Sequence, residues 1–426
     1  MRFSFQKKLT VTSDQLKDIS FVLFFCSTVV TGAVSILLRP FGLAAYSTAI
    51  KLVIIYLPLL VTLFATPEKI KVDFLVILAV LVCFFCISYF IHPEYGEWYG
   101  LSSYGAWDYV FRPDNGLYAY LFLRLIREPE RIWKNLHIIS WILLPYHGYK
   151  LIGALRVGYW TQSSVDGSVG HYAYNLTFGY SVLLLTLIFL YRAIKQHSLS
   201  DWIGAGISIV MIALGGSRGP FLCLGIFVLL MVLTSEKKLS RSGIVFTAFA
   251  TFFSILAFVY YKALVKLFLA FISAMGLSSR TLTMILQGGI ADDNGRQRIW
   301  NAAIQMIKDN PWGHGAMGSR LVIRNLIDVG HPHQVFLEIL IDFGIIIGGA
   351  IIVIMLIASF RMLFRTEDKS WQGLFIVFFC RACQLLLSGT FWHVSAIWAC
   401  LGIGVNYITS KRKARNAWLI QEHQMQ

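Results

Sequence analysis

Blocks of about twenty apolar residues recur along this 426-residue chain, and no other feature constrains its fold as strongly. A helix of that length crosses the hydrocarbon core of a lipid bilayer. Only 14% of the residues are charged, whereas a soluble protein carries about 25%. The sequence therefore predicts an all-α polytopic membrane protein.

We predict about twelve transmembrane helices from the apolar blocks. Their ranges are 18–38, 45–65, 73–91, 108–126, 134–153, 174–194, 200–216, 219–235, 243–263, 335–358, 372–391 and 394–410. A long loop separates the ninth helix from the tenth. We accordingly divide the chain into helices one to nine (1–263), a loop domain (264–334), and helices ten to twelve with a basic tail (335–426).

The basic residues predict an orientation with both termini in the cytoplasm. In this arrangement the inner segments carry about twenty Lys and Arg residues, in keeping with the positive-inside rule. The short outer loops carry four, namely Arg39, Arg112, Arg156 and Arg218. The same bias explains the net charge of +15, so we expect a lipid bilayer and no nucleic acid as partner. The long loop then lies outside the cytoplasm.

The long loop is expected to contain short helices. Residues 264–277 are apolar but too short to span, which favours a helix lying in the membrane interface. Residues 296–309 have helical spacing, and Pro311 should end that helix. Its predicted apolar face consists of Trp300, Ala303, Ile304 and Ile307. A second outer segment, 92–107, is rich in Tyr and Trp. We interpret it as an interfacial aromatic belt, the alternative being a surface that stacks on sugars.

Two arginines are candidates for binding an anion. Arg218 follows two glycines in a hairpin too short to reach far into solvent, and an arginine near membrane level is functional by default. A snorkelling arginine that orders the turn is the alternative. Arg296 begins the predicted loop helix, where the free N–H groups and the helix dipole already favour negative charge. Its alternative is a solvated charge.

Two histidines and two further charges are candidates for chemistry. His331 and His333 could ligate zinc, but no third ligand stands at a recognised spacing, so we predict no metal. A neutral histidine beside fixed cations would instead act as a general base, or merely cap a helix. Glu338 lies near the start of the tenth helix. Arg381 lies within the eleventh, where we expect a polar cavity or a carboxylate partner, Glu338 or Asp342.

Cysteine is not expected to carry chemistry here. Cys83 and Cys86, and likewise Cys380 and Cys383, have C-x-x-C spacing, which could indicate metal or redox chemistry. Both pairs lie inside apolar blocks without a nearby histidine or partner carboxylate. We interpret them as buried free thiols that pack as small hydrophobic groups, and we predict no cofactor.

Three separated motifs stand out: Ser217-Arg218-Gly219, then Gly295-Arg296-x-x-x-Trp300 with Asn310-Pro311-x-Gly313-x-Gly315, and then His333-Gln334-x-x-Leu337-Glu338 with Gly344. Together they resemble the motifs of the O-antigen ligase and polymerase superfamily, whose members are multispanning membrane glycosyltransferases of the bacterial cell envelope. Many members have His-Asn where this chain has His333-Gln334, which keeps the amide. The resemblance covers about residues 205–345.

The resemblance implies a lipid diphosphate-linked oligosaccharide as donor, normally carried on undecaprenyl. An acceptor hydroxyl would attack the anomeric carbon, with no metal, cofactor or nucleotide sugar required. It implies His333 as the general base and Arg218 and Arg296 as the residues that hold the diphosphate. Further candidates for the site are His331, Arg280, Arg381 and Glu338.

Three functional hypotheses follow. The leading one is a polymerase in the bacterial cytoplasmic membrane that joins repeat units of a capsule, exopolysaccharide or O-antigen on the outer face, with other polysaccharide assembly proteins as partners. The second is a ligase that transfers finished chains to lipid A-core or another acceptor glycan. The third, from another class, is a transporter of lipid-linked oligosaccharide; the absence of an internal repeat weighs against it.

Overall fold

The computed structural model describes residues 12–65, 72–163, 169–172, 175–215, 217, 219–235, 261–274, 283, 286, 295–327 and 330–425. Most of these residues are helical. They include four helices long and apolar enough to cross a membrane, or five if the bent pair α1 and α2 forms one span. The all-α membrane class is thereby confirmed, and the number of twelve spans stays a prediction.

The helices before the long loop form one part of the bundle. Their bounds are α1 (Ser13–Phe25), α2 (Ser27–Leu38), α3 (Ser47–Ala65), α4 (Val72–Ile91), α5 (Gly96–Tyr99), α6 (Gly116–Leu125), α7 (Pro129–Val157), α8 (Leu176–Gln196), α9 (Leu199–Gly215) and α10 (Gly219–Leu233). A short antiparallel hairpin, β1 (Trp160–Ser163) with β2 (Val169–Tyr172), joins α7 to α8 and pairs Trp160 with Tyr172.

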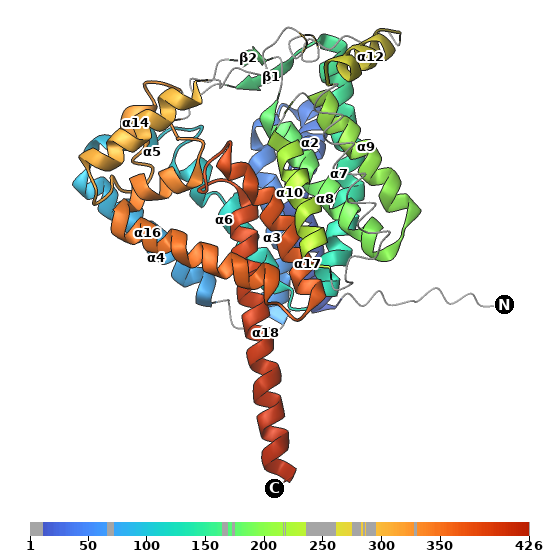
Figure 1. Ribbon diagram of the computed structural model, residues 1–426, viewed down its shortest axis with the longest axis vertical. Coiled ribbons are helices and arrows are strands. Elements are labelled where there is room, and N and C mark those ends of the chain that lie inside the picture. The colour runs from blue at the N-terminus through green and yellow to red at the C-terminus, as the bar shows by residue number, and fades with distance from the viewer. Residues whose placement is uncertain are drawn as a thin grey trace, which may run out of the picture.

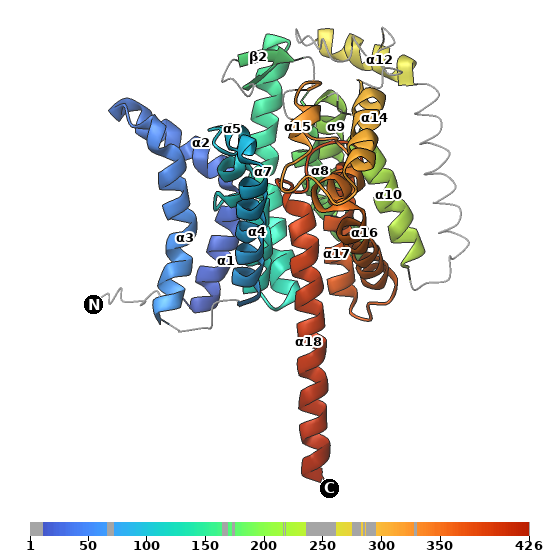
Figure 2. The same cartoon turned by 90° about the vertical axis from the view of Figure 1, so that its left-hand side faces the viewer.

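The remaining helices follow from the long loop onward. Their bounds are α12 (Tyr261–Ala274), α14 (Arg296–Asp309), α15 (Arg320–Ile323), α16 (Val335–Phe364), α17 (Lys369–Ala382) and α18 (Ser395–Met425). Figures 1 and 2 show α12, α14, α15 and the hairpin at one end of the bundle, which we call the upper end. The distal part of α18 projects from the opposite, lower end, where α1 also begins.

Several predicted spans match the observed helices closely. Helices α3, α4, α8, α9 and α10 lie within two residues of the predicted bounds at each end. The predicted ninth span, 243–263, falls largely outside the described residues. The predicted first span, 18–38, is wrong as one straight helix, because the chain turns by 81° between α1 and α2. Neither proline nor glycine stands at this break, where the buried Cys26 leaves helical geometry.

The predicted fourth span, 108–126, is also wrong as one helix. The segment Trp107–Phe111 is a separate turn, and α6 begins only at Gly116. Pro113 explains the break, because it disfavours helical geometry in the residue before it, and Arg112 is extended at ψ 130°. Ion pairs then stabilise the turn, with Lys51 Nζ 2.5 Å from Asp114 Oδ2.

The predicted eleventh span, 372–391, ends too late. Helix α17 stops at Ala382, and a short 3₁₀ turn, Cys383–Leu386, follows. Beyond it Gly389 has a φ of 85°, which only glycine adopts readily. Residues 387–394 therefore form a loop, which we call the α17–α18 loop, and its backbone and side chains contact the functional site.

The predicted loop helix 296–309 is confirmed at both ends by α14. Its predicted apolar face is partly wrong. The buried residues are Ile299, Ala303 and Met306, whereas Ile304 is 42% exposed. The helix is turned this way because its apolar side packs against Ile323 of α15 and Ile341 of α16, and Trp300 and Ile307 flank that contact.

Candidate functional site

A loop formed by residues 310–319 joins α14 to α15 and lies against a kink in α16. Gly344 has non-helical angles, φ 76° and ψ 173°, so the hydrogen bonds of α16 are interrupted there. The loop replaces them. Three backbone hydrogen bonds join the two segments, from His314 to Ile341 (2.7 Å), from Gly315 to Asp342 (3.0 Å) and from Ile345 to Pro311 (2.8 Å).

Glycine is required where the loop and the kink meet. A Cβ on Gly344 would lie 2.4 Å from the backbone of Trp312, and one on Gly313 would lie 2.5 Å from the backbone nitrogen of Gly344. Both residues also have positive φ. Two glycines of the motifs thus allow backbone to approach backbone, and this contact fixes the start of α16.

The aromatic outer segment holds the other side of this loop. The Tyr95 hydroxyl donates to the His314 carbonyl and the Tyr99 hydroxyl donates to the Ala316 carbonyl, each at 2.7 Å. Tyr95 is fully buried and Trp98 is only 5% exposed. The interpretation of this segment as an interfacial belt is therefore wrong for these residues, which pack inside the protein.

The segment that carries His331 and His333 is fastened at both ends. The Ser319 hydroxyl donates to the Gly330 carbonyl at 3.0 Å, and the Trp300 indole of α14 donates to the Pro332 carbonyl at 3.2 Å. Gln334 caps α16, since its side chain accepts a bond from the Leu337 N–H at 2.7 Å. Because Trp300 of α14 contacts this segment, the motif that begins at Gly295 lies beside the motif that begins at His333.

His333 lies between this segment and the α17–α18 loop. It has a φ of 54°, a left-handed conformation that is uncommon outside glycine. The Gly389 N–H donates to its Nδ1 at 3.3 Å. Burial, reinforced by the positive charge of Arg296, lowers the pKa of His333 to about 4. His333 is therefore neutral at pH 7, and because Nδ1 accepts a hydrogen bond, its proton sits on Nε2.

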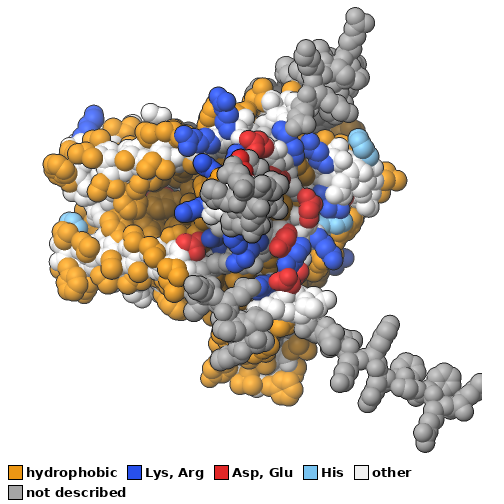
Figure 3. Space-filling model, turned by 90° about the horizontal axis from the view of Figure 1, so that it is seen from below, with side chains coloured by type: hydrophobic (Ala, Val, Ile, Leu, Met, Phe, Trp, Pro, Cys, Tyr) orange, Lys and Arg blue, Asp and Glu red, His pale blue; other side chains and the backbone are white. Residues whose placement is uncertain are grey.

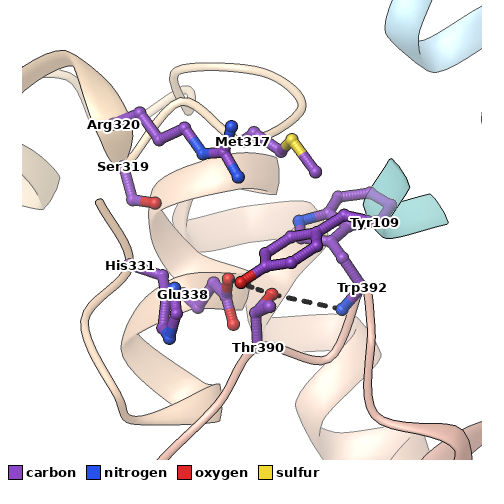
Figure 4. A pocket seen from close by; sticks show the side chains of 8 residues that line it. All are labelled: Tyr109, Met317, Ser319, Arg320, His331, Glu338, Thr390 and Trp392. Atoms are coloured by element: carbon purple, nitrogen blue, oxygen red, sulfur yellow. Dashed lines mark hydrogen bonds between the residues drawn. The ribbon is translucent and has the colours of Figure 1, made fainter. Parts of the chain in front are cut away.

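A small pocket opens among buried side chains near the histidine segment (Figure 4). His331 forms part of its wall, and the ring centroids of His331 and His333 are 4.4 Å apart. The pocket is lined by Tyr109, Met317, Ser319, Arg320, His331, Glu338, Thr390 and Trp392. Arg320 contributes a guanidinium and Glu338 a carboxyl group to this lining.

The Glu338 carboxyl group is tied to the α17–α18 loop. Glu338 accepts the Thr390 hydroxyl at 2.5 Å on one oxygen and the Phe391 N–H at 3.3 Å on the other. One turn further along α16, Asp342 accepts the Trp392 indole N–H at 2.9 Å. Both carboxylates are buried. These bonds hold the loop over the start of α16 and orient Glu338 towards the pocket.

The guanidinium in the lining belongs to Arg320, which the sequence did not single out. Its side chain is buried, and burial lowers the pKa of Arg320, although an arginine stays charged near pH 7. Its guanidinium donates to the Tyr104 carbonyl at 2.6 Å and lies 5.5 Å from the centre of the Tyr109 ring. Four other arginines share its loop, so its burial could not be predicted from spacing.

The remaining predicted site residues fall in three places. Arg218 and Arg280 lie outside the described residues. Arg296 is close enough to act electrostatically on both His333 and the Tyr180 hydroxyl. The expected pairing of Arg381 with Glu338 or Asp342 is wrong: its guanidinium lies 5.4 Å from the Tyr180 ring and hydrogen-bonds Gln384. The carboxylates are instead occupied by the α17–α18 loop.

Comparison with known proteins finds a family match in the central part of the chain. Within the described ranges, no three His, Cys, Asp or Glu residues come together as metal ligands. No curated protein matches the chain. Residues 203–353 match the family model described as O-antigen ligase. Members of this family are glycosyltransferase-like enzymes of bacterial membranes. The match includes Arg296, His333 and Glu338, and it agrees with the resemblance of the motifs to the O-antigen ligase and polymerase superfamily.

Proposed function

We propose that the protein polymerises a surface polysaccharide by joining repeat units carried on undecaprenyl diphosphate. The reaction would take place at the outer face of the cytoplasmic membrane. The observation that carries this proposal is the contact between two separated motifs: Trp300, on the helix that Arg296 begins, donates to the Pro332 carbonyl beside His333 at 3.2 Å, within the stretch that matches the O-antigen ligase family model. A fixed cation beside a neutral imidazole suits transfer from a diphosphate-linked donor without a metal.

In the proposed reaction a hydroxyl of the acceptor glycan attacks the anomeric carbon of the donor sugar. The new C–O bond forms as the bond to the diphosphate breaks, and the lipid diphosphate leaves with the electron pair. Arg296 and Arg218 hold the diphosphate, because a guanidinium offers several donors in one plane and stabilises the charge that develops. His333 takes the proton of the attacking hydroxyl.

The hydrogen bond of His333 adds a condition to this step. The single lone pair of the neutral ring is on Nδ1, and the Gly389 N–H covers it at 3.3 Å, which is a long and weak bond. The acceptor hydroxyl has to displace that bond in order to deliver its proton. We therefore infer that the α17–α18 loop shifts when the acceptor binds.

The test uses purified protein in lipid nanodiscs with lipid-linked repeat units, and the products are separated by mass. The wild type should give a ladder of chain lengths, and His333→Ala should lower the rate by about 10²–10⁴-fold. His197→Ala is a matched control, because His197 also has a positive φ (53°) but is exposed at the far end of α8. Undiminished polymerisation by His333→Ala would refute the proposed base.

The same products separate the other hypotheses. A ligase is supported by the description of the family, and it would give one transfer of a finished chain to an acceptor such as lipid A-core, without a ladder. A transporter would move lipid-linked sugar across the vesicle wall and form no glycosidic bond.

The predicted orientation, with both termini in the cytoplasm, has one further support. Seen from below, Lys and Arg side chains gather around α18, with fewer Asp and Glu, while apolar side chains cover the flanks (Figure 3). This basic end is the one expected to face the cytoplasm. The site would then lie at the outer end, where a lipid-linked donor and a growing glycan can meet.

A further inference from the structure

We propose that Glu338 is a positioning residue for His333: it holds the α17–α18 loop so that the Gly389 N–H meets Nδ1, and it thereby keeps the lone pair of the imidazole on that nitrogen. The inference rests on the proposed function, in which His333 receives the proton of the attacking hydroxyl. Glu338 touches no substrate in this role. Its effect on the reaction passes through the loop.

The carboxyl group of Glu338 has a donor from the loop at each of its two oxygens. The Thr390 hydroxyl donates to one oxygen at 2.5 Å, and the Phe391 N–H donates to the other at 3.3 Å. The Thr390 oxygen in turn accepts the Trp392 N–H at 3.2 Å, which leaves its proton for Glu338 (Figure 4). Glu338 thus accepts a bond at each oxygen, whereas an amide at this place would offer only one acceptor.

Glu338 and His333 belong to one short stretch of chain. Gln334 caps α16, because its side chain accepts the Leu337 N–H at 2.7 Å, and its carbonyl accepts the Glu338 N–H at 3.0 Å. His333 directly precedes this cap and has a φ of 54°, an uncommon conformation for a residue other than glycine. A loop fastened to Glu338 is therefore fastened at a defined place relative to the imidazole.

The fastening leaves Gly389 as the point where the loop meets His333. The two N–H groups before it in the loop donate to the Gln384 carbonyl at 2.8 and 2.7 Å. On its other side, Thr390 is held by Glu338. Gly389 lies between these anchors with a φ of 85°, and its N–H reaches Nδ1 at 3.3 Å. Because that bond is long, we infer that the anchored neighbours keep it in place.

The bond at Nδ1 decides which nitrogen of His333 can act as the base. A neutral imidazole has one proton and one lone pair, and the hydrogen bond at one nitrogen sets which of the two it holds. With the Gly389 N–H in place, the lone pair stays on Nδ1. Once the loop is released, the proton can move to Nδ1. That nitrogen would then have no lone pair with which to accept the proton of the attacking hydroxyl.

The direct test reads the imidazole without substrate. The full-length protein is labelled with ¹⁵N-histidine in proteoliposomes, and solid-state NMR gives the protonation state of each ring nitrogen at pH 7. The signals of His333 are those that vanish in His333→Gln. The wild type should have its proton on Nε2 alone, and Glu338→Gln should show a mixture of both tautomers. An unchanged tautomer in Glu338→Gln would overturn the proposal.

Kinetics separate positioning from a general loss of structure. With lipid-linked repeat units, Glu338→Gln should lower kcat by about tenfold to a hundredfold, because the base is misplaced. It should leave KM for the donor within about twofold, since other residues hold the diphosphate. Glu367→Gln is the matched control: its side chain is 82% exposed and pairs with Lys411, so kcat and the tautomer should not change. Wild-type kcat in Glu338→Gln would refute the role.

The pH dependence of kcat gives a further readout. Arg296 acts on His333 from α14, and the His331 ring lies 4.4 Å away between centroids. Burial, with this positive charge, holds the pKa of His333 at about 4. Release of the loop would admit water to the imidazole, so in Glu338→Gln the acid fall in rate should move from near pH 4 towards pH 6.5. A fall that stays near pH 4 would count against control by Glu338.

Thr390 variants keep the inference testable if Glu338→Gln does not fold. Thr390→Ser keeps the hydroxyl and should keep the single tautomer, whereas Thr390→Val removes the hydroxyl and should mix the tautomers. Equal spectra for these two variants would overturn the proposal. The proposed function can fail separately. Full polymerisation by His333→Ala would remove the imidazole from the reaction, while the dependence of its tautomer on Glu338 would remain.

Discussion

Backbone strain gathers around the site at the scale of single residues. Four described residues other than glycine have positive φ, namely Tyr104, His197, Met317 and His333. Three of them belong to the site. Tyr104 accepts the bond from Arg320, Met317 lines the pocket, and His333 is the proposed base. Such conformations cost about 1–3 kcal/mol each and persist where surrounding contacts fix them, often at functional sites.

The pKa of His333 gives a prediction about pH. Because burial and Arg296 hold it at about 4, His333 should remain able to accept a proton well below pH 6.5. The rate should therefore fall on the acid side only near pH 4. The measurement is the rate as a function of pH, taken from short time points with lipid-linked substrate. A fall at about pH 6.5 would contradict the buried, neutral imidazole.

The same shift predicts the direction of a stability change. The unfolded chain binds a proton at His333 with a pKa of about 6.5, and the folded chain binds it only near 4. Between these values the unfolded state holds more protons, so this contribution to folding is complete above pH 6.5 and is lost as the pH falls towards 4. Thermal unfolding in detergent should show a smaller acid-induced drop in Tm for His333→Gln than for the wild type.

At the scale of elements, local signals predicted some features and missed others. The bounds of α14 were predictable because Pro311 ends the helix locally. The kink at Gly344 was not, because it depends on hydrogen bonds from a loop thirty residues away in sequence, between Pro311 and Ile345. The end of α17 was missed because apolar residues continue through Leu387, although Gly389 marked the later loop. Arg320 was missed because only tertiary packing separates it from its neighbours.

The kink itself can be tested by filling it. Gly344→Ala would place a Cβ 2.4 Å from the Trp312 backbone at a residue with positive φ, so the loop would have to move. We expect a loss of about 2 kcal/mol or more of stability, together with lower activity. Gly349→Ala is the matched control, because a Cβ there meets nothing within 4 Å. Equal Tm values for the two variants would contradict the close backbone contact.

The link between α14 and the histidine segment gives a second test. Trp300→Phe removes the indole that donates to the Pro332 carbonyl at 3.2 Å while it keeps most of the packing. Loss of one such bond, about 0.5–1.5 kcal/mol, should lower the rate about two- to tenfold by loosening the placement of His333. Trp312→Phe, at a side chain 80% exposed, should leave the rate unchanged. A rate for Trp300→Phe equal to that of the wild type would show that this hydrogen bond does not position His333.

At the scale of the whole molecule, the two ends of the bundle differ in chemistry. The upper end carries α14 and α15, and the lower end carries the basic residues around α18 (Figures 2 and 3). Composition and hydropathy predicted the membrane class, because both are sums over many residues. The pocket was not predicted, since its walls come from segments up to about 280 residues apart, from Tyr109 to Trp392.

The orientation predicts a labelling pattern in intact cells. A cysteine placed at Trp312, which is 80% exposed in the loop between α14 and α15, should react with a membrane-impermeant maleimide. A cysteine at Lys411, which lies on the exposed part of α18, should react only after the cells are opened. The reverse pattern would place the site in the cytoplasm and exclude assembly at the outer face.

The interruption of α16 separates two tasks that a continuous rod would couple. Residues 335–343 carry Glu338 and Asp342 and accept two backbone bonds from the loop, whereas the stretch beyond Gly344 begins with the Ile345 bond to Pro311 and then exposes Ile346 and Ile347 to its surroundings. When acyl chains lengthen or shorten, the lower stretch can change its tilt to match them. The residues before Gly344, which carry the reacting groups, need not take part in this change of tilt. Turnover should accordingly vary little among bilayers of different thickness, because the reacting groups keep their relative positions when the rest of α16 tilts.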